Sequence, residues 1–279
     1  PLGALVTAAP GDPQAVAWWL RRSALAQLPA ASALQSLRRT AGRPVAPRPL
    51  LGFGDPVFQR AVGVEGNGAT AYDAERGFRY GRMPALPDTR TELLAIAGAL
   101  GADPARDLLL GPAATRRAVL AADLSDRRVV AFATHALMPG ELPGVSKPSL
   151  ALAAAADERE SPLLELDDVL GLRLNAQWVL LSACNTAAGE RGDGAMSGLV
   201  RGFFFAGARS VLATHWAVES RSAAQLTAGT FGRAGQGGSG RADSLRQAQL
   251  DLADGRAGEG RWRHPFYWSA YALFGDPVR

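Results

Sequence analysis

Three short stretches of the chain are almost continuously apolar, without the alternation of a half-exposed strand. They cover residues 129–134, 178–183 and 210–214. Strands that are buried on both faces have this pattern, and they occupy the centre of parallel sheets covered by helices on each side. The pattern therefore predicts three central strands of a parallel sheet.

Segments with apolar residues at helical spacing separate and flank these strands. The first begins near Thr89, where Thr89 and Glu92 have the spacing of a capping box, and ends before Gly101. Further helices are predicted over residues 114–122, 166–172, 196–205, 220–231 and 243–252, with a last strand over residues 267–274. Strands that alternate with helices predict an α/β fold, here a three-layer α/β/α sandwich with a mainly parallel central sheet.

Two segments near the N-terminus fit this alternation less well. Residues 14–39 have apolar positions at helical spacing that are interrupted at Pro29, which predicts two short helices or a helix and a strand. Residues 42–82 hold much of the chain's glycine and proline, and this composition predicts an irregular, exposed and mobile insertion. We expect residues 1–279 to form one domain that lacks its N-terminal edge.

The composition is that of an ordinary globular protein, with 47% hydrophobic and 20% charged residues. Cys184 is the only cysteine, which excludes a disulfide framework and fits a reducing compartment. No stretch approaches ~20 uninterrupted apolar residues, so we expect no membrane partner and a cytoplasmic location. Because the chain opens at Pro1, we expect a processed product or a piece of a longer protein.

The net charge of +4 does not by itself indicate a nucleic-acid partner. Of the 30 basic residues only Lys147 is a lysine, and alanine, glycine and proline are abundant as well as arginine. A coding bias toward GC-rich codons explains all four enrichments together. The arginines occur as scattered pairs instead of one basic run, so we expect no nucleic-acid partner.

Two familiar ligand-binding patterns fail on their context. Residues 235–240 match the glycine spacing of a dinucleotide-binding loop, but they follow a predicted helix and not a strand, which favours a flexible loop. Three histidines and one cysteine contain no pair at metal-ligand spacing. The sequence therefore predicts neither a cofactor nor a metal.

The most informative pair of residues is His135 and Cys184. Each follows a predicted central strand, and the carboxyl ends of parallel strands form the edge where ligand crevices occur. If the two strands are neighbours, the imidazole would lie beside the thiol and lower its pKa from about 8.5. A histidine about 50 residues upstream of the cysteine is also the caspase arrangement. Taken singly, each residue is more simply a structural one.

Successive segments of the chain resemble the motifs of the CHAT family of caspase-like cysteine peptidases, relatives of separase and the caspases. The order and spacing agree over nearly the whole chain. The matching segments are residues 129–135 (VVAFATH), 179–186 (VLLSACNT), 192–198 (GDGAMSG), 204–208 (FFAGA), 213–218 (ATHWAV), 248–249 (AQ) and 264–268 (HPFYW).

The resemblance implies a caspase-like fold and a cysteine endopeptidase that acts on protein or peptide substrates. It implies that His135 and Cys184 form the catalytic dyad and that the backbone N–H groups of Ala136 and Cys184 hold the oxyanion. In this family the domain commonly follows tetratricopeptide-type repeats, which implies upstream repeats or a regulatory partner. His215 and His264 do not match the dyad and are expected to be structural.

Departures from the family pattern qualify this assignment. Ala136 replaces the glycine that usually follows the histidine, which keeps the N–H but disfavours a positive φ. After Trp216, where the family has an acidic pair, this chain retains one acid, Glu219. We expect Trp216, Glu219 and Asp193 to contact substrate, with Glu219 favouring Arg or Lys before the cut. The alternative for Glu219 is that it begins the helix at residue 220.

Two other functions remain open at this point. A catalytically silent domain that serves as an interaction or scaffold module would have the same fold. A nucleotide-binding α/β protein is a weaker third alternative. The sequence does not define the natural substrate, the activating signal or the oligomeric state. We expect the loop over residues 187–196 to order when substrate or an upstream partner binds.

Overall fold

The structure is a computed structural model. It describes residues 2–7, 16–28, 35, 38, 42–59, 80–139, 145–154, 160–183, 198–235 and 239–278. The predicted loop over residues 187–196, together with Cys184 and Asp193, lies outside these residues.

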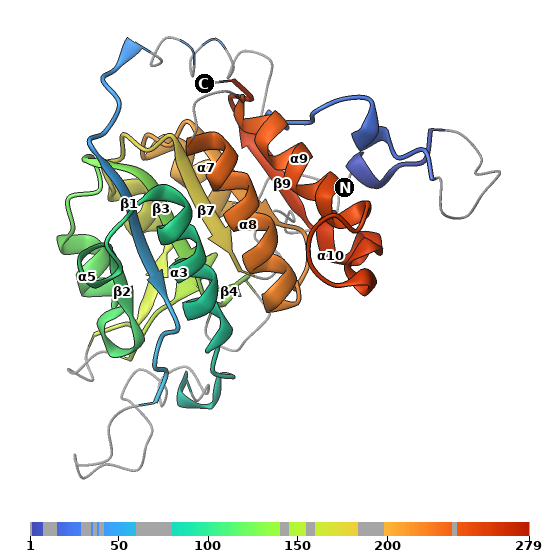
Figure 1. Cartoon of the computed structure of the whole chain (residues 1–279). Helices are drawn as coiled ribbons and strands as arrows, with labels where there is room; N and C mark the ends of the chain where they lie inside the picture. The colour runs from blue at the N-terminus through green and yellow to red at the C-terminus, as the bar shows by residue number, and fades with distance from the viewer. Residues whose placement is uncertain are drawn as a thin grey trace.

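A six-stranded sheet forms the centre of the molecule, in the order β2-β1-β3-β7-β8-β9 (Figure 1). All neighbouring pairs are parallel except β8 and β9, which are antiparallel. The prediction of a mainly parallel sheet is therefore confirmed. The strands are β1 (Arg48–Gly54), β2 (Leu108–Leu110), β3 (Arg127–Ala133), β7 (Trp178–Ser182), β8 (Ser210–Thr214) and β9 (Tyr271–Gly275).

Helices cover both faces of this sheet. They are α3 (Asp88–Leu100), α4 (Pro104–Asp107), α5 (Arg116–Ala121), α6 (Leu166–Gly171), α7 (Gly198–Phe205), α8 (Ser220–Gly235), α9 (Arg241–Ala253) and α10 (Pro265–Trp268). The helices predicted between residues 89 and 252 are confirmed to within a few residues. The predicted last strand differs, because residues 265–268 are helical and the strand begins at Tyr271.

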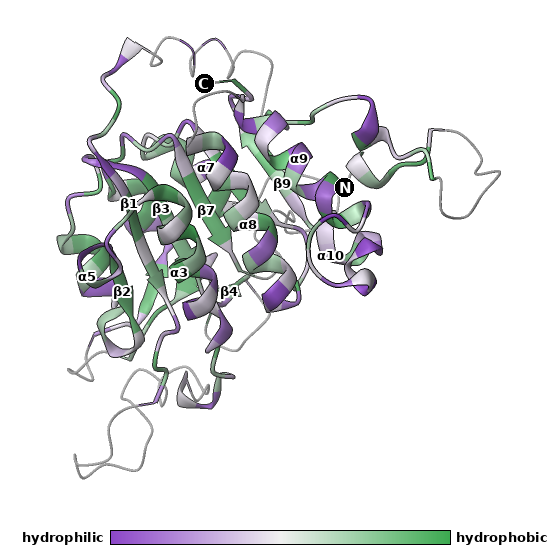
Figure 2. Ribbon diagram, in the orientation of Figure 1, coloured by the Kyte–Doolittle hydropathy of each residue, from purple (hydrophilic) through white to green (hydrophobic). Residues whose placement is uncertain are grey.

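The strands divide their side chains between two buried clusters, one on each face. Phe132 and Leu181 pack with α5, α6 and α7, whereas Ala131 and Leu180 pack with α3, α8, α9 and α10. Helices α3 and α8 lie side by side across the second face (Figure 1). The central strands are mainly hydrophobic, while the helices mix polar and apolar residues (Figure 2). Burial on both faces explains why the strand sequences do not alternate.

The expectation of an irregular insertion over residues 42–82 is wrong where the structure describes that segment. Residues 48–54 form β1, a buried strand between β2 and β3. Its two glycines serve close packing: a Cβ at Gly52 would lie 2.8 Å from a methyl of Leu108, and one at Gly54 would lie 2.6 Å from a methyl of Leu93. Glycine marks close approach here instead of flexibility.

We therefore expect Gly54→Ala to destabilise the domain by about 1–3 kcal/mol, because the new methyl overpacks the contact with Leu93. Urea unfolding measures the loss. Gly98→Ala is the matched control, since Gly98 lies exposed on α3 with no atom within 4 Å of the added Cβ. Alanine there is expected to raise stability by about 0.5–1 kcal/mol. Equal effects at the two positions would contradict this account of β1.

The described residues 16–28 do not form the predicted helix. They contain a single 3-10 turn, η2 (Trp19–Arg21), and then an extended segment in which Gln27 pairs with Phe274 beside β9. The apolar side chains instead cover α9, α10 and β9, where Leu20 is buried and Trp18 packs edge-on against Trp268. The apolar side chains are thus buried by tertiary contacts, although the segment does not form the helix that their spacing predicted.

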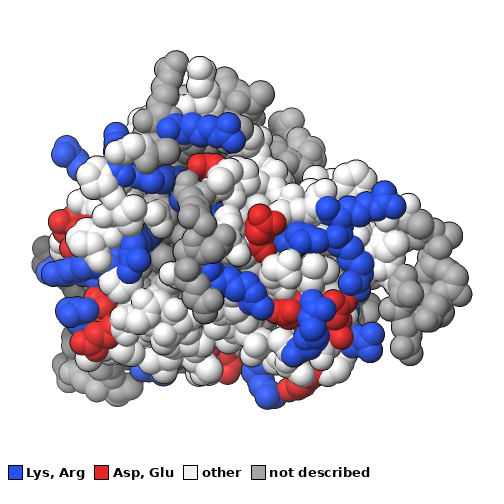
Figure 3. Space-filling view, turned by 45° about the horizontal axis from the view of Figure 1, so that its top comes forward, with Lys and Arg blue, Asp and Glu red and all other residues white. Residues whose placement is uncertain are grey.

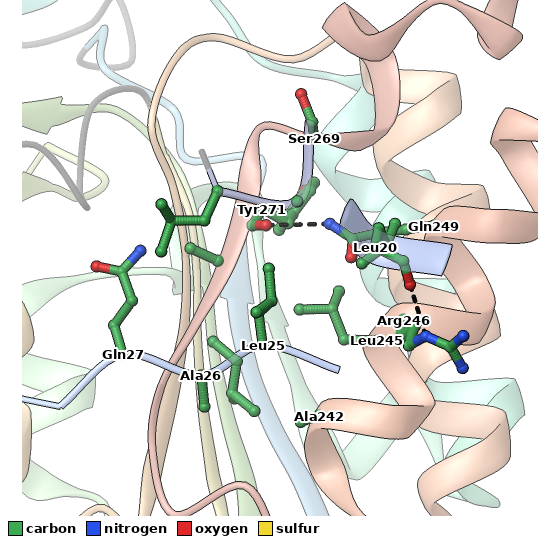
Figure 4. A pocket seen from close by; sticks show the side chains of 14 residues that line it. Leu20, Leu25, Ala26, Gln27, Ala242, Leu245, Arg246, Gln249, Ser269 and Tyr271 are labelled. Atoms are coloured by element: carbon green, nitrogen blue, oxygen red, sulfur yellow. Dashed lines mark hydrogen bonds between the residues drawn. The ribbon is translucent and has the colours of Figure 1, made fainter. Parts of the chain in front are cut away.

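An apolar pocket lies between this N-terminal segment, α9 and β9 (Figure 4). The guanidinium of Arg246 donates to the backbone oxygens of Leu20 and Arg21. The side-chain amide of Gln249 donates to the carbonyls of Trp268 and Tyr271. The first pair of bonds attaches the N-terminal segment to α9, and the second attaches α9 to the start of β9.

A small antiparallel sheet extends the carboxyl edge of the main sheet. It consists of β4 (Ala136–Leu137), β5 (Ser149–Ala151) and β6 (Leu163–Glu165), none of which the sequence pattern predicted. Five 3-10 helices, counted among the described residues, complete the structure: η1 (Leu2–Ala4), η2, η4 (Tyr80–Arg82), η5 (Gly111–Ala113) and η6 (Gly260–Arg263). Because β4 follows β3 after two residues, the small sheet fixes the chain on both sides of His135.

Arginines and acidic side chains are interspersed on the face of the molecule that Figure 3 shows. Many of the arginines are paired, as Arg233 is with Asp251 and Arg261 with Glu259. No helix in the described part of the chain has the length and apolar character needed to cross a membrane.

Candidate active site

A pocket opens at the carboxyl edge of the parallel strands. It holds about 480 Å³ of space, part of which is open to solvent. Residues from the ends of β3, β7 and β8 meet there with residues of α3, α8 and β9. The lining residues are Leu86, Thr89, Glu92, Thr134, His135, Ser182, Ala183, Thr214, Trp216, Val218, Ser220, Ala223 and Tyr271. The switch from strand to loop at this edge is the usual place of a ligand site in such sheets.

His135 follows β3 by two residues and lines this pocket. Its ring packs on Phe58, with the ring centroids 5.4 Å apart, and its Nε2 lies 2.9 Å from the carbonyl oxygen of Pro84. A carbonyl can only accept, so Nε2 carries the hydrogen of this bond. The Pro84 carbonyl therefore orients the imidazole and leaves Nδ1 as the nitrogen available for proton transfer.

The backbone around His135 is fixed by β5. Ala151 N donates to His135 O at 2.9 Å, and the hydroxyl of Thr134 donates to Ala151 O. Ala136 lies directly after the histidine, at the start of β4, and is buried. Among the described residues other than glycine, a positive φ occurs only at Asp55, so alanine is unstrained at position 136. The backbone therefore tolerates the departure from glycine noted above.

The end of β7 forms the opposite wall of the pocket. Strands β3 and β7 are neighbours and parallel, and their last matched pair is Ala133 with Ser182. Ala183 lines the pocket, and its carbonyl accepts a hydrogen bond from Thr214 at the end of β8. Cys184 is the next residue in the chain and lies outside the described residues.

Sequence reasoning missed Glu92, which is 2% exposed at the inner side of the pocket. The expected capping box is wrong: α3 has no side-chain cap, and the Glu92 carboxylate accepts hydrogen bonds from the hydroxyls of Ser182 at 2.8 Å and Thr227 at 3.3 Å. Burial raises the pKa of Glu92 to about 7, although these hydrogen bonds act in the opposite direction and lower it. Its place on the same helix face as Leu93 and Ile96 was the sequence signal for an inward carboxyl group.

The other predicted substrate-binding residues lie in different settings. Trp216 lines the pocket, stacks on Phe266 with centroids 6.3 Å apart, and donates its ring N–H to Phe266 O. Glu219 is not among the residues that line the pocket. One of its carboxylate oxygens accepts from Ser222 N at 2.8 Å, in the first turn of α8, and the other accepts from Arg261 at 3.3 Å. A substrate role for Glu219 stays a prediction.

The two remaining histidines occupy structural positions. The His264 ring accepts from Phe266 N and caps α10. His215 is half-buried after β8, and burial lowers its pKa. Neither lines the pocket. Within the described residues, no group of three or more His, Cys, Asp or Glu side chains is arranged to hold a metal ion.

Comparisons with known proteins place the chain in a broader context. The family model of the CHAT domain matches residues 1–276. Tetratricopeptide repeat protein 28 from Mus musculus is 29% identical over 223 residues, which covers 70% of this chain and 9% of that protein. The chain thus spans about a tenth of the length of this curated relative.

Among solved structures, the crystal structure of the Arg-specific cysteine proteinase gingipain R is similar with a TM-score of 0.43 and 11% identity. The match covers 67% of this chain and 41% of that one. A likeness of this size carries no argument about the present chain.

Proposed function

This chain belongs to the CHAT domain family, and from that premise we propose that it is a cysteine endopeptidase that cleaves protein or peptide substrates. The proposal rests chiefly on the register of β3 and β7. Ala133 and Ser182 are partners on adjacent parallel strands. In the sequence, His135 follows Ala133 by two residues, and Cys184 follows Ser182 by two residues. An oriented imidazole that lines a pocket at this edge supports a role for the pair in catalysis.

In the proposed mechanism the Cys184 thiolate attacks the scissile carbonyl carbon, and the imidazolium of His135 gives its proton to the leaving amine. The resulting thioester is then hydrolysed by a water molecule whose proton His135 accepts, which restores the thiol and releases the acid. The N–H groups of Ala136 and Cys184 stabilise the oxyanion. Trp216, Glu219 and Asp193 contact substrate. The reaction needs no metal or cofactor.

A second candidate function has its own support. The matched relative is named for its tetratricopeptide repeats, and a domain that follows such repeats can act as a scaffold. We propose that upstream repeats or another regulatory partner control this domain in either case. A cytoplasmic location also stays a prediction. A scaffold has no physical need for a thiol activated by an imidazole, and this difference separates the two functions.

The pH dependence of Cys184 alkylation tests the proposal, and the absence of other cysteines makes the signal specific. We expect iodoacetamide to react with a thiolate whose pKa lies well below the usual value of about 8.5, because the His135 imidazolium stabilises it. His135→Ala is expected to return the midpoint toward about 8.5, and His264→Asn to leave it unchanged. A parent midpoint near 8.5 would favour the scaffold function instead.

A further inference from the structure

The pocket is lined by a buried carboxyl group that no cation among the described residues neutralises. Glu92 is 2% exposed, and in the part of the chain that the structure describes no ion pair includes it. The proposed mechanism gives it no role. A buried carboxylate without a positive partner is costly, so such a group usually either stays protonated or serves a ligand.

Within the described part of the chain, the side chains that hydrogen-bond to Glu92 are all hydroxyls. They come from three elements: Ser182 from β7, Thr227 from α8 and Tyr271 from β9. The Ser182 hydroxyl also lies 3.1 Å from the phenolic oxygen of Tyr271. Hydroxyls donate hydrogen bonds to a carboxylate but do not cancel its charge. Burial accordingly raises the pKa of Glu92 to about 7, which leaves the group poised between its two forms near neutral pH.

The pocket has room for a side chain that reaches Glu92, because several of its lining residues are small. These small residues are Thr89, Ser182, Ala183, Thr214 and Ala223. The larger His135 and Trp216 belong to the same lining, at the ends of β3 and β8. Among these lining residues Glu92 is the single carboxylate, so it favours a cationic ligand, and a guanidinium can bind a carboxylate through two hydrogen bonds.

We propose that Glu92 makes this pocket the binding site for the cationic end of a substrate's arginine or lysine side chain. The assignment rests on the proposed peptidase function and identifies its substrate class. It also moves the specificity-determining acid from Glu219 to α3. Both oxygens of Glu219 already accept hydrogen bonds, and Glu219 does not line the pocket.

Binding of a minimal ligand tests this site without requiring cleavage. The ligands are N-acetyl-arginine methylamide and its citrulline counterpart, which has nearly the same shape but no charge, measured by isothermal titration calorimetry on Cys184→Ala protein. We expect the arginine ligand to bind at least tenfold more tightly than the citrulline ligand. Glu92→Gln should remove this difference, while retaining partners for Ser182 and Thr227. Asp88→Asn, which changes an exposed acid one turn earlier on α3, should preserve it.

The proton balance of binding gives a second readout. At pH 6 Glu92 is mostly protonated, so pairing with the guanidinium should release close to one proton per ligand, and above pH 8 almost none. Among the described residues, His135 and Tyr271 are the other titratable side chains that line the pocket. Release that persists in His135→Ala but is lost in Glu92→Gln assigns the proton to Glu92. Equal binding of both ligands by the parent protein, at any pH, would overturn the proposal.

A cleavage assay separates failure of this inference from failure of the proposed function. With fluorogenic peptides that differ only before the cut, we expect Arg and Lys to exceed citrulline, Leu and Asp at least tenfold in kcat/KM. Glu92→Gln should lose this preference, with kcat/KM for the Arg and Lys peptides falling to that of the citrulline peptide. Cleavage with no basic preference, or a preference that Glu219→Gln removes and Glu92→Gln does not, would overturn the role of Glu92 alone. A depressed thiol pKa without any cleavage would count against the peptidase itself, and ligand binding would still decide the site.

Discussion

Replacing Cys184 with alanine is expected to abolish peptide cleavage, with a fall in kcat/KM of about 10³-fold or more. His135→Ala should cause a comparable loss, because the nucleophile and its proton carrier act as a unit and their effects do not add. The double variant should therefore be no worse than either single one. A continuous assay with fluorogenic peptides measures all three.

Stability separates loss of chemistry from loss of fold. His135 is partly exposed, and the contacts described above for its side chain are those with Phe58 and the Pro84 carbonyl. Its replacement by alanine should therefore shift Tm by no more than a few degrees. His264→Asn is the matched control, since asparagine can also cap α10 and the ring lies away from the pocket. If Cys184→Ala cleaved at the parent rate, the dyad mechanism would be wrong.

The second large effect, a loss of stability, is expected at the buried ion pair between Asp107 at the end of α4 and Arg127 at the start of β3. Asp107 at the end of α4 is fully buried, and it accepts hydrogen bonds from Arg127 at 2.7 Å and from Arg106. Asp107→Asn should cost about 3 kcal/mol, because it leaves the buried guanidinium of Arg127 without its closest counter-charge. Asp126 lies 2.9 Å from Arg127 and still provides a negative charge in the variant. The loss of stability should therefore be near the lower end of the range for broken buried ion pairs. Urea unfolding at pH 7 measures it.

The pH dependence of this loss identifies its electrostatic origin. The hydrogen bond from Arg106, followed by that from Arg127, lowers the pKa of Asp107 to about 2 from an ordinary value near 4. The ionised form therefore stabilises the fold fully above about pH 4, and this contribution disappears as the pH falls toward 2. The difference in the free energy of unfolding between the parent protein and Asp107→Asn should become smaller over the same pH interval. Asp243→Asn, an exposed change on α9, should show no such trend. A gap that stayed constant would indicate a packing effect instead.

The sequence by itself determined the layers of the fold and the strands that precede the two residues of the proposed dyad. Strands β3, β7 and β8 were predictable because a strand that is buried on both faces needs apolar residues at nearly every position. A short, continuously apolar run is therefore typical of such a strand. The positions of His135 and Cys184 after two of these runs predicted one shared edge. That β3 and β7 are neighbours was a condition the sequence left open, since strand order depends on how distant segments pack.

Only the tertiary structure decided the roles of residues whose local pattern allows two readings. In β1 the glycines looked like loop punctuation, yet Leu93 and Leu108 occupy the space where a Cβ would stand. Glu92 had the spacing of a capping residue, yet the packing of α3 against α8 and β7 turns its carboxyl group inward to Thr227 and Ser182. Propensity and spacing act within a few residues, whereas close packing and burial depend on side chains that are distant in sequence. The sequence therefore singled out His135 and Cys184 as the proposed dyad, and the fold brought the buried carboxyl group of Glu92 to the pocket that His135 lines.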